Sequence, residues 1–453
     1  MSIPQCPRGN DYGDNALKYT GEPNLDFRSI SDPSVLYYDN KWYLYPSYGM
    51  CFVSEDFATW KHVRTEPYDM TYSPSVIPYN GKFLMTAHSH GLYIGETPTG
   101  PFKYLGKFIM PDGTETEPVD SALFLDDDGR IYIYWFADGD YKEDGSFTSM
   151  TVGVELDRND PRKFMTMPVV IHKFNPENSW EHNGADNQDT KFGWIEGQWM
   201  LKHNGRYYLQ YACPGAEINV YADGVYVSDY PLGPFIPAEN NPYSYHPDGF
   251  MPGAGHGSTL QDREGAFWHT ATMRISMNHI FERRVGIWPA GFDPEGNLFC
   301  NQRYGDWPMD VEKIRKNPWA DPEWMLLSYG KAVTVSSCDP SHPAENAVDE
   351  NCQTWWRAAD AQPGQGLTVD LGKPMKIHAA QVNFADDPDA NISSPAKLVT
   401  GPDMPRYIDL TEHHTRWLLE ASADGENWSV LADKRQAETD LSHDLAIVES
   451  GVT

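Results

Sequence analysis

Three acidic residues that lie far apart in the chain share the same local surroundings: Asp32, Asp120 and Glu196. Each stands just before a short apolar run, a polar turn and an aromatic strand. The three hairpins that follow them cover residues 34–45, 121–135 and 197–209. If these hairpins are arranged around one axis, the three carboxyl groups meet at its mouth. Carboxyl groups in such an arrangement can cleave a glycosidic bond by acid and base catalysis.

Strand signals recur along the chain, whereas helix signals are scarce. Aromatic or β-branched alternation is broken by turns such as Asn80-Gly81 and Asn204-Gly205. A Gly-Pro-Phe segment follows two of the hairpins, at residues 100–102 and 233–235. This repeated unit of roughly four strands predicts a five-bladed β-propeller, with blades near residues 26–65, 70–110, 118–172, 194–238 and 255–303.

The composition changes after the last predicted blade. Residues 304–327 are rich in Trp and Pro, and we expect a packed linker because a flexible tether would need Gly and Ser. Residues 328–453 alternate strand and turn signals without helices, which predicts a second all-β domain, a β-sandwich of the jelly-roll type. The predicted fold class is therefore all-β: an N-terminal extension (1–25), a propeller domain (26–303), the linker and the sandwich.

The size and charge of the chain limit the kinds of molecule that it can bind. With 453 residues it is long enough for two or three domains, and its formal net charge is −30. Such a field repels a phosphate backbone, which excludes nucleic acid as a partner, whereas a neutral glycan is indifferent to it. No apolar stretch approaches the ~20 residues of a membrane-spanning helix. The sequence carries no indication of an oligomeric state.

The first residues and the cysteines bear on the compartment. Residues 1–20 are polar and lack the apolar centre of a signal peptide. We expect a secreted or periplasmic protein whose signal peptide is absent from this sequence, and a cytoplasmic location stays open. The six cysteines form no CxxC pair. Cys338 and Cys352 are close enough to bridge a loop; the alternative is that they are reduced and buried.

The order of the motifs in residues 26–303 resembles glycoside hydrolase family 43. The Asp-Pro-Ser segment at Asp32 matches the segment that carries the general base of that family. Asp120 matches the strand-start Asp that tunes the acid and orients the substrate, and Glu196-Gly197 matches the segment with the general acid. A Gly-His-Gly-Ser segment contains His256 and matches one whose His lies near the propeller axis, often beside a calcium ion or an ordered water.

The resemblance also implies substrate contacts at three positions: Tyr72, His256 and Arg283. Tyr72-Ser73-Pro74 stands where the family often has Trp-Ala-Pro, so Tyr72 replaces a sugar-contacting Trp. Arg283 stands where some members place a sugar-binding Arg, and Arg284 is its close rival. The chemistry needs no organic cofactor, and a structural Ca²⁺ near His256 is expected, with a water or sugar contact as the alternative.

Each candidate acid also has a structural interpretation. Asp32 precedes a proline and could be a turn residue; Asp120 could cap a strand, and Glu196 could pair with Lys202. We prefer the catalytic interpretation because Trp194 beside Glu196 would raise the pKa of its carboxyl by burial, as a general acid needs. Two rival acids are not placed by any strand start: Glu181 and Asp189.

Residues 328–453 resemble a discoidin-like domain, the coagulation-factor type C fold, at segments such as 369–372 and 422–428. No closing Arg-Tyr-type strand precedes Thr453, as expected of a truncated or incomplete domain. Although this fold often binds sugars, Trp355-Trp356 falls in the part of the motif that packs the core. We therefore predict that the domain is chiefly a docked structural partner.

Together these features predict an exo-acting glycoside hydrolase that acts on a neutral plant-type glycan, and the family resemblance implies that it inverts the anomeric carbon. Asp32 would activate water and Glu196 would protonate the leaving oxygen. The first expectation for the sugar is terminal α-L-arabinofuranosyl, as in an α-L-arabinofuranosidase. A β-D-xylosidase, or a β-galactosidase or galactanase, is the alternative on the same scaffold. The alternative from another class is a non-catalytic glycan-binding propeller.

Overall fold

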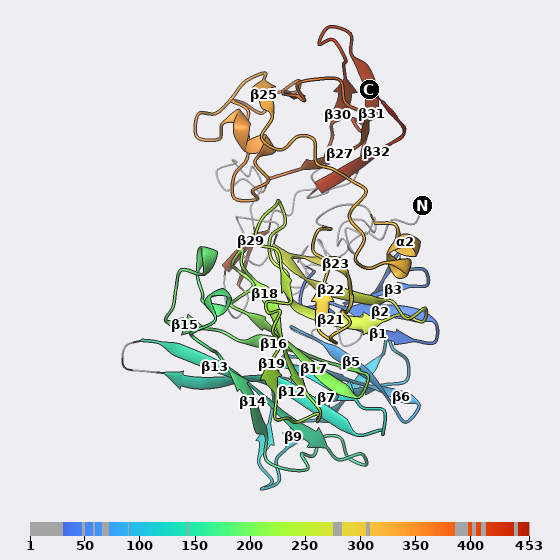
Figure 1. Cartoon of the computed structure of the whole chain (residues 1–453), viewed down its shortest axis with the longest axis vertical. Coiled ribbons are helices and arrows are strands. Elements are labelled where there is room, and N and C mark those ends of the chain that lie inside the picture. The colour runs from blue at the N-terminus through green and yellow to red at the C-terminus, as the bar shows by residue number, and fades with distance from the viewer. Residues whose placement is uncertain are drawn as a thin grey trace.

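The computed structural model describes residues 30–47, 50–57, 59–65, 72–88, 90–141, 143, 145–274, 283–304, 309–385, 397–400, 405–408, 414–438 and 443–452. The predicted N-terminal extension, residues 1–25, lies outside the described residues. Residues 34–300 form five antiparallel sheets that are arranged as the blades of a propeller (Figure 1). The predicted all-β class and the five blades are confirmed. The domain boundaries stay predictions.

The first two blades have four strands each, in sequence order from the axis outward. Blade 1 consists of β1 (Ser34–Tyr38), β2 (Lys41–Tyr45), β3 (Met50–Ser54) and β4 (Lys61–Arg64). Blade 2 consists of β5 (Ser75–Tyr79), β6 (Lys82–Thr86), β7 (Leu92–Gly95) and β8 (Phe102–Gly106). A small pair connects blade 2 to blade 3: β9 (Phe108–Ile109) and β10 (Glu115–Thr116).

The other three blades follow the same order, and two of them gain a short extra strand. Blade 3 consists of β11 (Val119–Leu125), β12 (Ile131–Tyr141), β13 (Phe147–Leu156), β14 (Val169–Lys173) and, beside β13, β15 (Phe192–Gly193). Blade 4 consists of β16 (Glu196–His203), β17 (Arg206–Cys213), β18 (Ala222–Ser228), β19 (Ile236–Pro237) and β20 (Ser244–Tyr245). Blade 5 consists of β21 (Gly255–Gln261), β22 (Phe267–Arg274), β23 (Arg283–Phe292) and β24 (Leu298–Cys300). Two short 3₁₀ helices lie between β14 and β15: η1 (Ser179–Glu181) and η2 (Ala185–Asn187).

Two-residue turns join the first two strands of blades 1, 2 and 4, as the sequence predicts, whereas longer loops join those of blades 3 and 5. Asn80 and Gly81 have φ of 48° and 77°, and Asn204 and Gly205 have φ of 48° and 78°. Two consecutive residues in the left-handed region are typical of the turn that matches the twist of a hairpin. These turns fix the register of each hairpin, and the register in turn decides which residue stands at the axis.

The five innermost strands form a closed ring around the axis. Each of β1, β5, β11, β16 and β21 contacts the next, and β21 contacts β1. The largest apolar cluster spans this closure, where Trp42 and Phe52 of blade 1 pack with Trp268 and Trp288 of blade 5. Closure leaves no free inner edge and places the starts of all five inner strands together.

A short helix packs on the propeller after blade 5. α2 (Val311–Lys316) begins at Asp310, whose side chain accepts a hydrogen bond from the Lys313 N–H. Val311 and Ile314 are buried in the cluster of blades 1 and 5. Arg315 Nε donates to the buried Asp262 at 2.9 Å. This segment is therefore attached by both apolar and ionic contacts.

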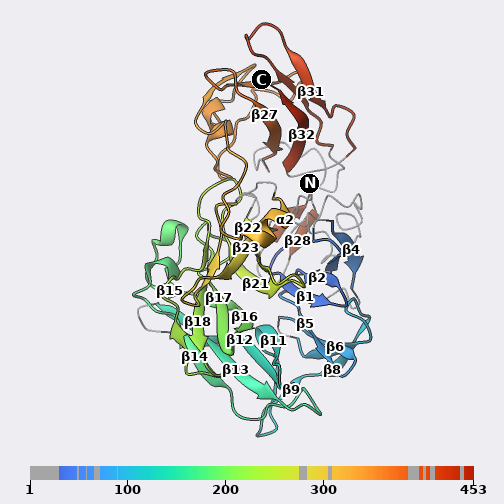
Figure 2. The ribbon, with the colours of Figure 1, turned by 45° about the vertical axis from the view of Figure 1, so that its right-hand side comes forward.

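The C-terminal region is also built of β-strands, most of which lie above the propeller in Figures 1 and 2. Four two-stranded sheets and one 3₁₀ helix are described: β25 (Ala332–Val335) with β26 (Leu367–Asp370), β27 (Ile377–Asn383) with β32 (His443–Val452), β28 (Lys397–Thr400) with β29 (Pro405–Ile408), β30 (Leu418–Ala421) with β31 (Ser429–Asp433), and η3 (Ala344–Val348). A parallel bridge between Gly249 and Asn351 joins this region to the loop before blade 5.

Two further expectations can be compared with the structure. Cys338 and Cys352 are both free thiols, so the loop-bridging disulfide is not formed. Within the described ranges, no helix is both long enough and apolar enough to span a membrane.

Candidate active site

Five equivalent positions surround the axis at the starts of the inner strands: Asp32, Ser73, Asp120, Gly197 and His256. Each lies two residues before the first residue of regular pairing in its strand. All five have positive φ, between 48° and 62°. Four of them are not glycine, and such residues rarely adopt this conformation unless the surrounding structure imposes it. Their concentration at one end of the axis indicates a functional site.

Blade 4 departs from this pattern, because its acidic residue lies one position before the residue with positive φ. Its left-handed position is Gly197, where a Cβ atom would stand 2.7 Å from His256 Cγ. Only glycine fits there, so the carboxyl group of this blade is carried one residue earlier, by Glu196. The pairing around this position is otherwise like that of blades 3 and 5, because the register shifts at the same place in all three strands.

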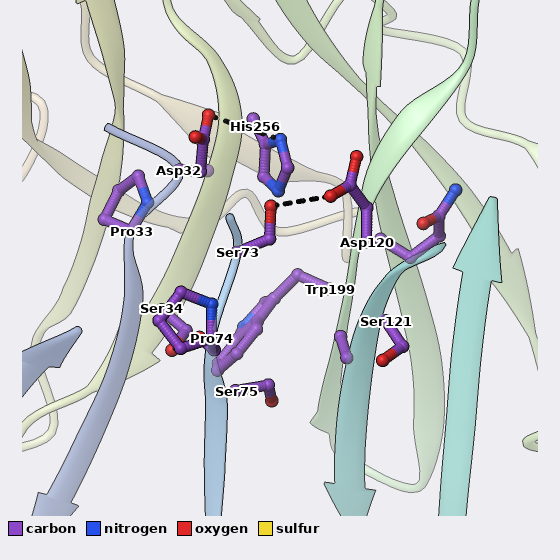
Figure 3. Close-up of a pocket in the computed structure, with 13 residues that line it drawn as sticks. Asp32, Pro33, Ser34, Ser73, Pro74, Ser75, Asp120, Ser121, Trp199 and His256 are labelled. Atoms are coloured by element: carbon purple, nitrogen blue, oxygen red, sulfur yellow. Dashed lines mark hydrogen bonds and ion pairs between the residues drawn. The ribbon is translucent and has the colours of Figure 1, made fainter. Parts of the chain in front are cut away.

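The axial positions open onto a small cavity between the inner strands. Its volume is about 20 Å³, room for about one water molecule. Figure 3 shows Asp32 and Asp120 on either side of His256 at one end, with Ser34, Ser75 and Trp199 farther along the axis. The structure thus brings together residues from all five blades.

Asp32 is buried and surrounded by groups that stabilise its charged form. Ser31 Oγ and Ser47 Oγ donate to Oδ2 at 2.9 and 2.7 Å, and Arg283 Nη1 donates to Oδ1 at 3.2 Å. His256 Nδ1 lies 3.5 Å from Oδ1. Burial alone would raise the pKa of Asp32, but Arg283, His256 and Ser47 outweigh it, so the pKa lies below its usual value. Asp32 is therefore a carboxylate near neutral pH.

Asp120 is buried as well, and both of its hydrogen bonds fall on Oδ1. Ser73 Oγ donates to this atom at 3.0 Å, and His88 Nδ1 lies 2.8 Å from it. Burial raises the pKa of Asp120, but His88, His256 and Ser73 lower it more, and the net pKa lies below the usual value. A second negative charge is thus held in the site.

Glu196 has the opposite electrostatic setting. Burial raises its pKa most, and the charge of Asp120 raises it further, to about 7. Trp194 Nε1 donates to Oε2 at 2.6 Å, and the Tyr221 hydroxyl donates to Oε1 at 2.5 Å. His256 and these hydrogen bonds act the other way, without cancelling the effect of burial. Glu196 therefore keeps its proton to a much higher pH than Asp32.

The predicted substrate-contacting residues lie at the same end of the axis. His256 lines the cavity, and Arg283 binds Asp32. The rival Arg284 instead donates to the Arg283 carbonyl oxygen from a buried position. Tyr72 lies at the rim, where its ring contacts that of His88 edge to face at 5.6 Å between centroids.

The structure does not contain the ion pair that the sequence allowed for Glu196, and it places the two rival acids away from the axis. Lys202 pairs with Asp126 and Asp127 at the far end of the hairpin, not with Glu196. Glu181 is buried outside the cavity and accepts hydrogen bonds from Tyr211, Asn178 and Asn175. Asp189 is exposed and accepts from the backbone of Lys191.

Several residues of the site were missed in the sequence: Ser47, Ser73, His88, Tyr221 and Thr272. For two of them a signal was present. Tyr72-Ser73-Pro74 repeats the spacing of Ser31-Asp32-Pro33, and His88 stands after β6 where Ser47 stands after β2. Tyr221 carried no local signal, because it reaches Glu196 only through the folding of blade 4.

The expected calcium ion can be tested against the groups that line the cavity. Gln198 Oε1 is buried there without a hydrogen-bond partner, so it and His256 could hold a cation. Among the residues that the structure describes, no three His, Cys, Asp or Glu side chains are arranged to hold a metal. The cavity has room for about one water molecule, so an ion could occupy it only in place of that water, and it would supply positive charge beside Asp32 and Asp120.

Comparison with known proteins identifies both parts of the chain. A family model described as glycosyl hydrolases family 43 matches residues 27–298, and the F5/8 type C domain model matches residues 332–400. The latter confirms the predicted discoidin-like sandwich. A crystal structure of a thermostable family-43 glycoside hydrolase superposes with a TM-score of 0.53 at 24% identity, covering 62% of this chain and 95% of that one.

Two curated relatives also match parts of the chain. A β-D-galactofuranosidase of Aspergillus niger is 26% identical over 241 residues, which is 45% of this chain and 62% of that protein. A xylan 1,3-β-xylosidase of Vibrio sp. is 24% identical over 346 residues, 69% of this chain and 58% of that protein. The matches span less than two thirds of either relative. Because the family model covers more than half of the sequence, the chain belongs to glycosyl hydrolases family 43 and carries an F5/8 type C domain.

Proposed function

We propose that this glycoside hydrolase is exo-acting and inverting, and that it removes terminal sugars from neutral plant-type glycans. The observation that carries the proposal is the contrast between two carboxyl groups. The pKa of Asp32 lies below its usual value, whereas that of Glu196 is about 7. Near neutral pH, one group is thus a carboxylate and the other keeps a proton, which are the states of a base and an acid.

In the proposed reaction, Asp32 removes a proton from a water molecule, and the water oxygen forms a bond to the anomeric carbon. The bond between that carbon and the leaving oxygen breaks on the opposite side, while Glu196 gives its proton to that oxygen. Inversion of this kind needs a carboxyl separation of roughly 6.5–9.5 Å. Asp120 raises the pKa of Glu196 by its charge, and its carboxylate can hold a sugar hydroxyl.

For the sugar, we propose α-L-arabinofuranosyl first. The names of the two relatives, a β-D-galactofuranosidase and a xylan 1,3-β-xylosidase, support furanosides and xylosides as the range to be tested. Tyr72, Arg283 and His256 would contact the sugar at the rim and the axis. A tyrosine ring can stack on the apolar face of a sugar as the family's tryptophan does.

A panel of aryl glycosides tests the proposal. Release of 4-nitrophenol is measured from the α-L-arabinofuranoside, the β-D-xyloside, the β-D-galactoside and the β-D-galactofuranoside. We expect turnover of the arabinofuranoside above all others, with the inverted sugar as the first product by NMR. No release from any of the four, with a folded protein, would favour a glycan-binding propeller instead.

Two substitutions separate the roles of the acid and the base. Glu196→Gln should lower turnover of arabino-oligosaccharides by about 10²–10⁴-fold and that of a 2,4-dinitrophenyl glycoside far less, because an acidic phenol leaves without a proton. Asp32→Asn should abolish both, since water must be activated whatever the leaving group. Glu181→Gln is the control for the rival acid. It should lower the melting temperature and leave the ratio of turnover on the two substrates unchanged.

We also propose that the protein works outside the cytoplasm, where a polymeric glycan is met. Fractionation of the cells that produce it, with an antibody against the propeller, tests this location.

A further inference from the structure

Both oxygens of the Glu196 carboxyl group are held by aromatic side chains from different parts of blade 4. Trp194 precedes β16 and binds Oε2 through its indole N–H at 2.6 Å. Tyr221 precedes β18 and binds Oε1 through its hydroxyl at 2.5 Å. Tyr221 is only 1% exposed, while Trp194 is partly exposed.

The two aromatic groups differ in what a hydrogen bond can do. An indole N–H is a donor only, whereas a tyrosine hydroxyl can donate or accept. Oε2 must therefore act as an acceptor toward Trp194 whether Glu196 is charged or neutral. In the neutral acid, the proton is left to Oε1, the oxygen that faces Tyr221.

We infer that Trp194 and Tyr221 are positioning residues that assign the acid proton of Glu196 to Oε1. This inference rests on the proposed role of Glu196 as the general acid. A carboxyl group that is free to rotate holds its proton on either oxygen, and one of the two points away from the leaving group. The carbonyl oxygen of a neutral acid is a better acceptor than its hydroxyl oxygen, so the Trp194 bond disfavours that second arrangement and favours the proton on Oε1.

The surroundings of both residues are rigid enough for this role. The Trp194 ring stacks on Phe136 at 4.6 Å and lies 5.6 Å from Phe147 and 6.3 Å from Phe192, against the long β12–β13 hairpin. The Tyr221 carbonyl accepts the Ala254 N–H at 2.7 Å. The Trp194 ring cannot turn away from the carboxyl group without breaking its ring contacts, and the backbone of Tyr221 is fixed beside the start of blade 5.

The position of Tyr221 is also fixed by a glycine. A Cβ atom at Gly255 would lie 2.8 Å from the Tyr221 ring, so that ring packs directly against the backbone beside His256. Burial, and then the charge of Glu196, raise the pKa of the Tyr221 hydroxyl well above its usual value. Tyr221 therefore stays neutral and keeps its hydrogen over the whole working range of pH.

Conservative variants test the assignment kinetically. Trp194→Phe keeps the stacking and removes the N–H, whereas Tyr221→Phe removes only the bond to Oε1. Both bonds lower the pKa of Glu196, so both variants should move the alkaline limb of kcat/KM to higher pH. Trp194→Phe should in addition lose about tenfold more activity on arabino-oligosaccharides than on the 2,4-dinitrophenyl glycoside, a fraction of what general acid catalysis contributes. Tyr221→Phe should show a smaller difference, since the proton stays on Oε1.

A matched control is available on the neighbouring loop. Trp180 is also partly exposed and contacts the Tyr211 ring at 5.8 Å, not Glu196. Trp180→Phe should leave the alkaline limb where it is in the unmodified protein. Equal losses of Trp194→Phe on both substrates, with an unmoved limb, would show that Trp194 only supports the structure and would overturn the inference.

Infrared difference spectroscopy reads the proton position directly. The spectrum of the protonated Glu196 carboxyl group is obtained by subtracting the spectrum of Glu196→Gln at a pH below 7. If Oε2 is the carbonyl oxygen, its C=O band should move to higher wavenumber in Trp194→Phe and stay in Tyr221→Phe. The reverse result would place the proton on Oε2 and overturn the inference. If Glu196→Gln instead lowered turnover equally on substrates with good and poor leaving groups, the proposed acid itself would be rejected.

Discussion

The charge of Asp120 offers the sharpest test of how the site works, because its effect on Glu196 can be separated from substrate binding. Asp120→Asn removes one negative charge and keeps the shape of the side chain, including an oxygen for Ser73 and His88. Burial is the largest cause of the raised pKa of Glu196, and Asp120 is the second. The substitution should therefore lower the pKa from about 7 but not return it to its ordinary value.

The magnitude follows from titration. One nearby like charge changes a pKa by about one unit, which corresponds to about 1.4 kcal/mol. A general acid must be protonated, so activity falls as pH rises through its pKa. With a pKa of about 7, half of Glu196 is protonated at pH 7. With a pKa lower by one unit, about a tenth is protonated, which is an additional loss of about fivefold at this pH.

The assay is the pH dependence of kcat/KM on an aryl arabinofuranoside with a poor leaving group. Because kcat/KM reports the free enzyme, its alkaline limb gives the pKa of Glu196 even if the absolute rate also falls. Asp127→Asn is the matched control, since its side chain is 84% exposed and it removes the same charge far from the site. An alkaline limb that stays in place or moves to higher pH in Asp120→Asn would refute the reasoning.

Three other predictions concern the scaffold. Gly197→Ala should cost more than Gly205→Ala in the free energy of unfolding, measured by urea denaturation; both have positive φ and should lose about 1 kcal/mol, but only the former meets His256. Equal costs would contradict the crowding at the axis. If calcium binds beside His256, exhaustive EDTA treatment should lower the melting temperature and added Ca²⁺ should restore it, whereas an unchanged melting curve would reject the ion. Deleting residues 328–453 should give an aggregating or unstable propeller, because the Gly249 bridge to that region is lost; a soluble, monomeric and fully active 1–327 fragment would contradict docking.

The sequence could predict those parts of the site that lie next to a local pattern. Asp32 precedes proline and a strand, and Glu196 precedes glycine and a strand, so their places at the axis follow from the repeat. The hairpin turns likewise predicted the blades. In contrast, the partners of these acids come from distant strands, and no local pattern marks them. Tyr221 lies 25 positions after Glu196, and Arg283 could not be distinguished from Arg284 until the strand showed which one faces the axis.

The closed ring joins the first blade to the last, and this has a consequence for how the enzyme is made on the ribosome. The Asp32 N–H binds Thr272, 240 positions later, and its carboxylate binds Arg283, 251 positions later. At about 5–20 residues per second, the base waits roughly 10–50 s for its counter-ion. During that time the carboxylate cannot be buried as it is in the finished protein, since a buried charge needs a partner. A polypeptide that stops short of the fifth blade therefore lacks both the ring and the partners of Asp32, and the proposed hydrolytic activity needs translation to pass residue 283.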